Sequence, residues 1–430
     1  MSLFWFIIRF LAVTVGFAAL HYYLWWRLFR DTTERGSLWR PVGAVVLGVL
    51  AGFGLLARFF TPSDAPLAFQ SAVGWPGLIW FGLFLYLFGL LIVGEAVRWL
   101  LVRRSRRGLS EGEAAVDRAD GFYVHLRELA ARLRLLPRLK APPVEPEPVP
   151  ETVHTRRRLM SRAIGVGAAA TAVATVGHGL YEGYRTPPLK PVTVSLAKLD
   201  RRFDGYRIAV VGDTHFSAIR GRGYCERVVD QINRADADLI AFVGDLASNE
   251  ADQVRDATDP LARLRARDGA YFVAGNAEHY VGADEWYDRV AELGMIGLPN
   301  TRVELAAFDL AGINDLIVEE RGFSGETGPD FEAALGDRDP DRPVVFLAHQ
   351  PNAIERAVDY GVDLQLSGHT HGGQMWPVHY ASLIRSGQLT GLERHGDAQV
   401  YVTNGAGTNG PPIRVGADAD ITVLTLRSPH

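Results

Sequence analysis

The sequence predicts an α/β domain in the C-terminal half of the chain, preceded by a bundle of about four helices that cross a membrane. Two observations lead to this prediction. Five short runs of apolar, β-branched and aromatic residues each end just before a polar side chain, as strands do when their carboxyl ends form a site. Upstream of these runs, long apolar segments reach the ~20 residues that a bilayer-spanning helix needs.

The composition narrows the class of protein. The chain has 430 residues, enough for more than one domain, and carries a net charge of -4. This charge provides no basic field for a nucleic acid, so we expect no nucleic-acid partner. Hydrophobic residues make up 48% of the chain and are concentrated in its first hundred positions. The single cysteine, Cys225, excludes a disulfide within the chain.

Three N-terminal segments are long and apolar enough to be membrane spans. Tryptophan, tyrosine and phenylalanine cluster at their edges, as they do at membrane interfaces. The segments comprise residues 4–26, 42–60 and 75–101, and together they form a predicted domain 1–102.

A fourth apolar segment, 164–180, lies in a predicted domain 159–185 and is less hydrophobic than the others. It follows Thr155-Arg156-Arg157-Arg158-Leu159-Met160, a run that resembles a twin-arginine export signal. An ordinary spanning helix with basic flanks would explain the same residues. Both interpretations place the following domain on the far side of the membrane.

Arginine residues indicate the orientation. The first loop and the stretch after the third segment each hold four arginines, whereas the loop 61–73 holds no arginine or lysine. Because basic loops remain in the cytoplasm, we expect the N-terminus and the domain after residue 185 to lie outside it. We therefore expect a multi-pass protein of the bacterial inner membrane with an extracytoplasmic C-terminal domain.

Residues 103–158 are predicted to form a cytoplasmic linker. Apolar residues recur at helical spacing over 121–136, and proline alternates with glutamate after them. This composition is typical of a semi-rigid spacer, to which we assign no chemistry.

Each of the five predicted strands is followed by residues that can bind a metal. The strands span residues 206–211, 238–243, 270–274, 343–348 and 362–367. No thiolate is among the donors, and a set of oxygen and imidazole donors suits Mn²⁺, Fe or Zn²⁺. In chain order the donors are Asp213, His215, Asp245, Asn276, His349, His369 and His371.

The spacing of the last two histidines leaves their arrangement open. His369 and His371 alternate by two, so both side chains would point the same way on an extended strand. A turn at this point would split them between two metals. Glycine precedes several of the donors, at positions 212, 244, 275 and 368, and would let the backbone approach the site closely.

The order of these motifs is specific. The chain contains Gly212-Asp213-Thr214-His215, then Gly244-Asp245, Gly275-Asn276, Ala348-His349-Gln350-Pro351 and Gly368-His369-Thr370-His371. This order resembles the calcineurin-like metallophosphoesterase superfamily. The phrases at 348–351, 368–374 and 404–414 are similar to a membrane-attached bacterial branch of it. The resemblance covers roughly residues 192–426.

The resemblance implies a fold, a cofactor and a role for each donor. The domain 186–430 should contain two sheets packed face to face and flanked by helices, with helices at 224–234, 284–293 and 352–360. The implied cofactor is a pair of divalent metal ions (Mn, Fe or Zn). One ion would be held by Asp213, His215 and His371, the other by Asn276, His349 and His369, and Asp245 would bridge them.

One position departs from the family pattern. Family members continue Gly-Asn with a histidine that stabilises the transition state or protonates the leaving oxygen, whereas this chain has Ala277. His279 lies two residues further on and is our candidate for this role, so Asp213 and His279 are the predicted catalytic residues. The alternative is that His279 is a surface residue of a loop.

Two residues are predicted to contact a phosphorylated substrate. Arg414 could meet a phosphate oxygen, although a structural ion pair would equally explain it. Asn276 offers a neutral carbonyl oxygen, which limits the negative charge that faces a phosphate.

The predicted function is metal-dependent hydrolysis of a phosphoester outside the cytoplasmic membrane. The expected partners are the membrane and a phosphorylated small molecule or lipid, such as a phospholipid or another cell-envelope phosphate. This substrate class rests on the expected position of the domain beside lipid head groups. The alternative is a catalytically weak or inactive membrane protein that binds metal and phosphate, because Ala277 replaces the usual histidine. The sequence leaves the oligomeric state unknown.

Overall fold

The computed structural model describes residues 3–60, 65–105, 151–323 and 325–429. The chain divides into two compact units. Unit 1 comprises Met1–Gly52 and Trp80–Thr175, and unit 2 comprises Phe53–Ile79 and Val176–His430. The linker predicted at 103–158 lies mostly outside the described residues, and its amphipathic segment 121–136 lies entirely outside them.

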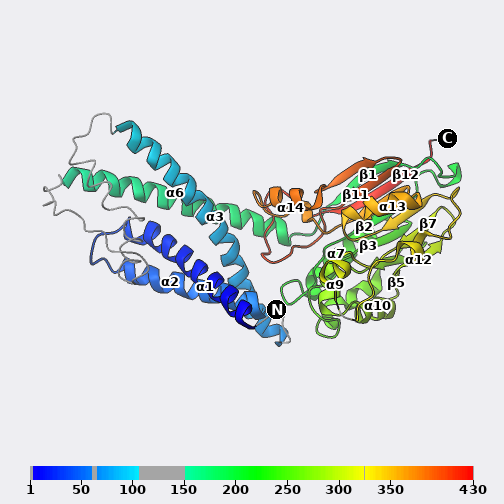
Figure 1. Cartoon of the computed structure of the whole chain (residues 1–430), viewed down its shortest axis with the longest axis horizontal. Helices are drawn as coiled ribbons and strands as arrows, with labels where there is room; N and C mark the ends of the chain where they lie inside the picture. The colour runs from blue at the N-terminus through cyan, green and yellow to red at the C-terminus, as the bar shows by residue number, and fades with distance from the viewer. Residues whose placement is uncertain (1–2, 61–64, 106–150, 324, 430) are drawn as a thin grey trace. The chain divides into compact units, whose positions relative to one another are not determined.

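Long helices make up the N-terminal part of the chain (Figure 1). Among the described residues, three helices are long and apolar enough to cross a membrane, over Trp39–Phe60, Leu67–Leu100 and Arg158–Tyr184. This corrects the prediction of about four spans. The segment predicted at 4–26 is helical over Leu3–Trp25, but the side chains before residue 14 lie outside the described residues, so this helix is not among the three. The helices are α1 (Leu3–Trp25), α2 (Trp39–Phe60), α3 (Leu67–Ser105) and α6 (Glu151–Tyr184), with a π-helical turn η1 (Trp26–Arg30) after α1.

Polar contacts join the helices within unit 1. Trp80 Nε1 donates a hydrogen bond to His21 Nε2 at 3.1 Å, which connects α3 with α1. Arg27 in η1 forms ion pairs with Glu95 of α3 at 2.9 Å and with Asp31 at 2.7 Å. Because a charge in apolar surroundings needs a partner, the pair with Glu95 fixes η1 against α3.

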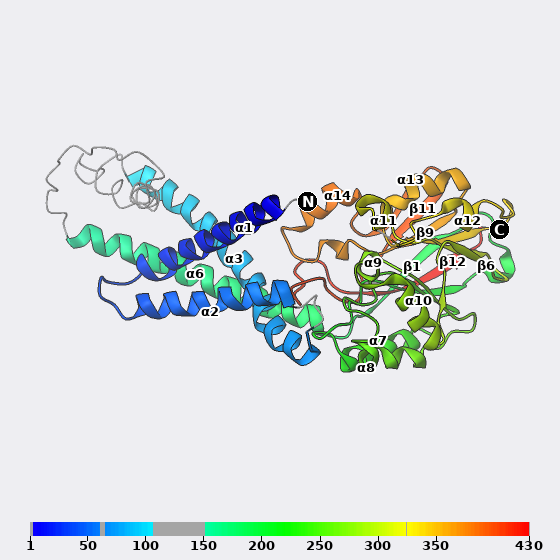
Figure 2. The same ribbon diagram turned by 60° about the horizontal axis from the view of Figure 1, so that its bottom comes forward.

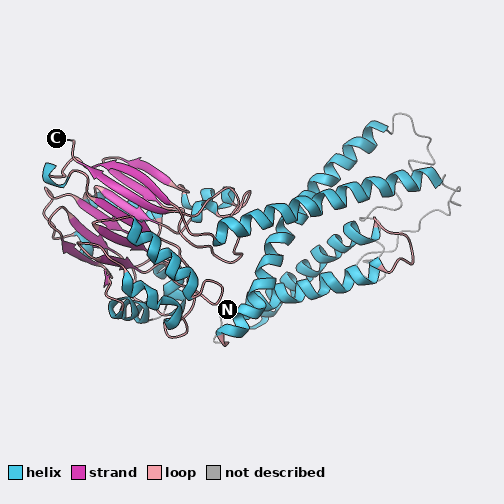
Figure 3. Cartoon of the chain, turned by 180° about the vertical axis from the view of Figure 1, so that it is seen from behind, coloured by secondary structure: helices cyan, strands magenta, loops and turns pink. Residues whose placement is uncertain are grey.

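Unit 2 contains two six-stranded mixed sheets that stack face to face, with helices on the outer faces (Figure 3). This confirms the predicted two-sheet sandwich. The first sheet has the order β1-β12-β2-β3-β4-β5 and the second the order β10-β11-β9-β8-β7-β6. The strands are β1 (Leu189–Ser195), β2 (Arg207–Val211), β3 (Leu239–Val243), β4 (Ala270–Val273), β5 (Ile296–Gly297), β6 (Thr301–Glu304), β7 (Asp309–Gly312), β8 (Val344–Leu347), β9 (Leu364–Ser367), β10 (Gly391–His395), β11 (Ala398–Val402) and β12 (Ile421–Arg427).

The helices of unit 2 are mostly short. Those expected at 224–234 and 284–293 are present as α7 and α10, and the one expected at 352–360 is split into 3₁₀ and α turns. They are α7 (Arg222–Arg234), α8 (Arg255–Thr258), α9 (Asn276–Val281), α10 (Ala283–Glu292), α11 (Ile317–Arg321), α12 (Phe331–Leu335), α13 (Ile354–Ala357) and α14 (His379–Ser386), with 3₁₀ turns η3 (Arg201–Phe203), η4 (Asp259–Arg263), η5 (Pro351–Ala353), η6 (Val358–Tyr360) and η7 (His371–Gly373).

Alternation of apolar side chains along the strands explains the layers. In β2, Ile208 and Val210 belong to the core between the sheets, whereas Ala209 and Val211 belong to the core under α7 and α10. Both faces of the strand are therefore covered, which explains its continuous apolar run. A third core lies between the second sheet and its own helices, around Phe346.

The direction of the strands determines where a site can form. β2, β3 and β4 are parallel neighbours in the first sheet, and β7, β8 and β9 are parallel neighbours in the second. Because parallel strands end at the same edge of a sheet, the loops that follow them meet there. The predicted metal-binding residues all lie in the segments that directly follow β2, β3, β4, β8 and β9.

Candidate metal centre

The seven predicted donors are brought together at the carboxyl ends of five strands. Five of the side chains are buried, and Asn276 and His369 are partly buried. Asp213 and His215 follow β2, Asp245 follows β3, Asn276 begins α9 after β4, His349 follows β8, and His369 and His371 follow β9.

One group of contacts joins the first and last of these loops. His215 Nε2 and His371 Nε2 lie 3.1 Å apart, and His371 Nε2 lies 3.3 Å from Asp213 Oδ1. Ligand atoms of these three residues and of Asp245 all lie within 4.8 Å of one another. Two carboxylates and two imidazoles at this spacing could hold a metal ion.

A second group of contacts lies on the other side of Asp245. Asn276 Oδ1 is 2.8 Å from His369 Nδ1 and 3.2 Å from His349 Nε2. The two imidazole nitrogens are 3.3 Å apart. These three atoms therefore converge on one point, as ligand atoms of a metal do.

Asp245 contacts both groups through different oxygens. Its Oδ2 lies 3.4 Å from His215 Nε2, and its Oδ1 lies 3.3 Å from His349 Nε2. A carboxylate placed in this way has one oxygen available to each group. The arrangement suits a shared ligand between two ions.

Turns in the left-handed region divide the adjacent histidines between the two groups. His369 has a φ of 71° and His371 a φ of 53°, so the segment is not an extended strand. Asp213 and Asp245 also have positive φ, at 55° and 52°. Such backbone conformations are uncommon for residues other than glycine, and they cluster at functional sites.

Glycine is required where the backbone passes the carboxylates. A Cβ atom at Gly275 would lie 2.4 Å from Asp245 Oδ1, and one at Gly368 would lie 2.4 Å from Asp213 Oδ2. Both distances are too short for any larger residue. The chain thus folds tightly around the two carboxylates.

The electrostatics of the centre favour a cation. Burial raises the pKa of Asp213 to about 7, and the neighbouring Asp245 carboxylate adds to this rise. Although burial opposes it, the attraction between Asp245 and His349 raises the pKa of the imidazole and lowers that of the carboxyl. Burial lowers the pKa of His215 to about 4 and also lowers that of His371, so both rings stay neutral at pH 7. Neutral imidazole is the form that binds a metal.

Hydrogen bonds to the outer ring nitrogens orient the imidazoles. His349 Nδ1 donates to Val243 O at 2.8 Å, so Nε2 faces the centre and would present its lone pair to a metal ion that displaces its proton. His215 Nδ1 lies 2.9 Å from Ser248 Oγ. The lone pairs of unprotonated imidazole nitrogens would be repelled by the oxygens of Asn276 and of the carboxylates. A metal cation between these atoms removes the repulsion, so this donor set fits divalent metal ions.

Glu278 binds the backbone of two turns that carry donors, and it was not among the predicted site residues. Its side chain is fully buried and accepts three backbone N–H groups, from Asp245 at 3.0 Å, Ala247 at 3.0 Å and Gly275 at 2.8 Å. It therefore fixes the two turns that carry Asp245 and Asn276. The sequence offered one indication, an acidic residue directly after Gly275-Asn276-Ala277.

Ala277 contacts one of the donors through its backbone, whereas the ring nitrogens of His279 contact other residues. The Ala277 N–H donates to Asp245 Oδ1 at 2.7 Å, so position 277 adjoins the shared carboxylate. His279 is buried with 1% of its side chain exposed, which excludes the alternative of a surface residue. Its Nδ1 contacts Glu326 at 2.8 Å, and its Nε2 accepts the Asp315 N–H at 3.3 Å. Both ring nitrogens thus have partners other than the seven donors.

The side chain of Arg414 binds backbone carbonyls within the domain, which is a structural role. Its side chain is buried, and each of its five N–H groups donates to a backbone carbonyl. One of these carbonyls belongs to His371, at 3.1 Å. The guanidinium therefore holds the backbone of His371, one of the predicted metal ligands, in place. It has no N–H group left for a phosphate oxygen.

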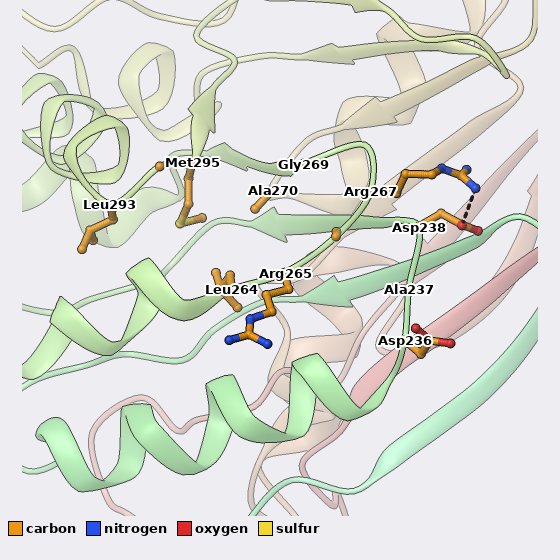
Figure 4. Close-up of a pocket in the computed structure, with 12 residues that line it drawn as sticks. Asp236, Ala237, Asp238, Leu264, Arg265, Arg267, Gly269, Ala270, Leu293 and Met295 are labelled. Atoms are coloured by element: carbon orange, nitrogen blue, oxygen red, sulfur yellow. Dashed lines mark ion pairs between the residues drawn. The ribbon is translucent and has the colours of Figure 1, made fainter.

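A pocket elsewhere in unit 2 is separate from this centre. It has a volume of about 590 Å³ and opens where β3 and β4 begin, whereas the donors lie where these strands end (Figure 4). Arg267 and Asp238 line it and form an ion pair at 3.1 Å. None of the seven donors lines this pocket.

Comparisons with known proteins agree with this geometry. A family model described as calcineurin-like phosphoesterase matches residues 206–373. A Helicobacter pylori (strain J99) protein named "uncharacterized metallophosphoesterase" is 31% identical over 274 residues, which cover 63% of this chain and 72% of that protein. The Bacillus subtilis protein YkuE, also named a metallophosphoesterase, is 30% identical over 64% of this chain and 98% of its own length.

An animal protein is similar over a comparable stretch. The Danio rerio "transmembrane protein with metallophosphoesterase domain" is 32% identical over 60% of this chain and 61% of that protein. The resemblance is therefore not confined to a bacterial branch.

Proposed function

Because the chain belongs to the calcineurin-like metallophosphoesterase family, we propose that it hydrolyses a phosphoester at a dinuclear metal centre. The observation that carries this proposal is the position of Asp245, whose two oxygens contact two separate groups of donors. Asp213, His215 and His371 would hold one divalent ion, and Asn276, His349 and His369 the other. Mn²⁺, Fe and Zn²⁺ all suit these donors.

Two bound ions would supply the activation of water and the neutralisation of charge on the phosphoryl group. The residues of the chain would hold the ions in place, and they limit the negative charge at the site. Asn276 contributes a neutral oxygen, so a phosphate meets less repulsion than it would from another carboxylate. The P–O bond to the leaving group breaks as water attacks phosphorus, and the leaving oxygen then needs a proton, which Ala277 cannot donate.

We propose a lipid-borne or other cell-envelope phosphate as the substrate class. The support is the chain's own anchoring, since α6 contains a candidate membrane span and is the element directly before β1. A domain attached in this way meets lipid head groups at high local concentration.

Turnover of an activated ester tests the proposed hydrolysis. We expect purified full-length protein loaded with Mn²⁺ to hydrolyse methyl nitrophenyl phosphate, because nitrophenolate leaves without a proton donor. Release of nitrophenolate is followed by its absorbance, with chelator-treated protein as the control. Absence of turnover by protein that retains both metals would refute the enzyme and favour the alternative, a protein that only binds metal and phosphate.

Reporter fusions test the proposed orientation. Because the first loop and the stretch after the third segment hold four arginines each whereas the loop 61–73 holds none, a reporter active solely outside the cytoplasm should be active when fused after Arg185. The same reporter fused after Pro143 should be inactive, and a cytoplasmic reporter should show the reverse pattern. Activity of the export-dependent reporter at position 143 but not at 185 would overturn the orientation.

A further inference from the structure

A cluster of exposed apolar side chains lies on unit 2 close to the metal centre. It begins after His371, the last of the seven predicted metal ligands, and continues through α14. We call it the α14 ridge. Its members, with their exposed fractions, are Trp376 (55%), Val378 (40%), Tyr380 (58%), Leu383 (41%) and Ile384 (87%).

The composition of this segment suits a lipid surface. Exposed apolar clusters of this kind mark protein or membrane contacts rather than ordinary surface. Residues 374–392 contain no aspartate or glutamate, so no carboxylate there would be repelled by lipid phosphates. Tryptophan and tyrosine are the residues that favour the headgroup level of a bilayer. These properties favour a membrane over a protein partner.

The α14 ridge is tied to the end of a candidate membrane span. The Trp376 N–H donates to Val415 O at 2.8 Å, and the Arg414 N–H donates to Gly179 O of α6 at 2.9 Å. A Cβ atom at Gly179 would lie 3.0 Å from a Val415 methyl group, so α6 and this loop are in direct contact. Within unit 2, the last turns of α6 and α14 lie on the same side of the two sheets (Figures 1 and 2). The ridge therefore lies close to the point where α6 ends.

The same segment is continuous with the metal centre. A Cβ atom at Gly373 would overlap the His379 side chain, so the turn after His371 packs directly against α14. Thr370 donates its hydroxyl to Leu389 O, which closes the segment on the far side of α14. A force that positions α14 would therefore also position His371.

We propose that the α14 ridge inserts into the headgroup region of the bilayer that α6 crosses and holds the metal centre at the membrane surface. Apolar faces bound in this way lie about 5–10 Å deep, at the boundary between head groups and acyl chains. Docking itself requires no hydrolysis. Only its consequence, better access to lipid-borne phosphoesters, rests on the proposed function.

A depth measurement tests the docking. The only cysteine, Cys225, is completely buried, so a fluorescent label can be attached selectively at Ile384→Cys in the full-length protein. Ile296→Cys is the matched control, because Ile296 is 44% exposed on β5 of the same unit. Both variants are placed in nanodiscs of phosphatidylethanolamine and phosphatidylglycerol, one chain per disc, with brominated acyl chains or aqueous iodide as quencher.

We expect brominated lipid to quench the label at position 384 several-fold more than the label at 296, and iodide to do the opposite. Equal quenching of both labels by iodide, with neither quenched by lipid, would overturn the proposal. Protection of position 384 from iodide without quenching by lipid would also overturn it, because a protein surface would then cover the ridge.

A substrate comparison tests the consequence of docking. The double variant Leu383→Ser/Ile384→Ser should hydrolyse a phosphatidyl nitrophenyl ester in the disc roughly tenfold more slowly, since two apolar side chains that insert into the bilayer are lost. Its hydrolysis of soluble methyl nitrophenyl phosphate should be unchanged. Equal losses on both esters would refute the presentation role. Absence of wild-type activity on the soluble ester would refute the proposed function instead, and the label depths would still decide the docking.

Discussion

Replacing Asp245 with asparagine should lower hydrolysis of an aryl phosphodiester by roughly a thousandfold or more, because several kcal/mol of charge stabilisation depend on the metals. The amide retains the shape of the side chain but removes the negative charge that contacts both groups of donors. We therefore also expect the Asp245→Asn protein to retain fewer than two metal ions per chain. Elemental analysis of protein purified without chelator measures this directly.

Asp309→Asn is the matched control for loss of a buried carboxylate. Asp309 is buried at the start of β7 and pairs with Arg342 at 2.8 Å, away from the loops that carry the donors. This variant should lose stability but keep both metals and its turnover number. Full metal occupancy and normal turnover in Asp245→Asn would contradict the bridging role.

Introducing histidine at position 277 should accelerate the hydrolysis of alkyl phosphodiesters by roughly tenfold or more, the lower range of general acid effects. An alkoxide leaving group needs a proton, and the Ala277 backbone already adjoins the shared carboxylate. Aryl esters should gain little, because nitrophenolate is stable without a proton. Initial rates of both ester types, measured for wild type and Ala277→His under the same metal loading, provide the comparison.

His279→Ala is the companion variant. If His279 supplies the proton, its removal should slow alkyl esters more than aryl esters. If the ring only joins Glu326 to the Asp315 backbone, both ester types should slow equally, or only stability should change. An Ala277→His protein that gains nothing on alkyl esters would show that proton donation does not limit this enzyme.

The strands that carry the site were predictable because both their faces are covered. β3 is buried at every position, so its sequence is one apolar run that ends at Gly244-Asp245. β10 is the opposite case, since its Leu-Glu-Arg-His residues are all exposed and no periodic pattern distinguishes them from a loop. β12 pairs with both β1 and β2, and no local pattern specifies a pairing between segments more than two hundred residues apart.

The order of the strands predicted the donors of the site, but it did not predict the residues that hold their loops in place. Seven donor residues after five strands predicted a centre, because parallel strands end together. The roles of Glu278 and Arg414 depend on turns in which backbone N–H groups or carbonyls point at one side chain. An arginine after two prolines offered no indication that its partners would be backbone carbonyls rather than phosphate.

Anomalous diffraction from crystals of the full-length protein loaded with Mn²⁺ tests the central claim most directly. We predict two peaks, one on each side of the Asp245 carboxylate. The first should lie among Asp213, His215 and His371, and the second among Asn276, His349 and His369. A single peak, or a second peak whose ligands do not include Asp245, would contradict the dinuclear centre.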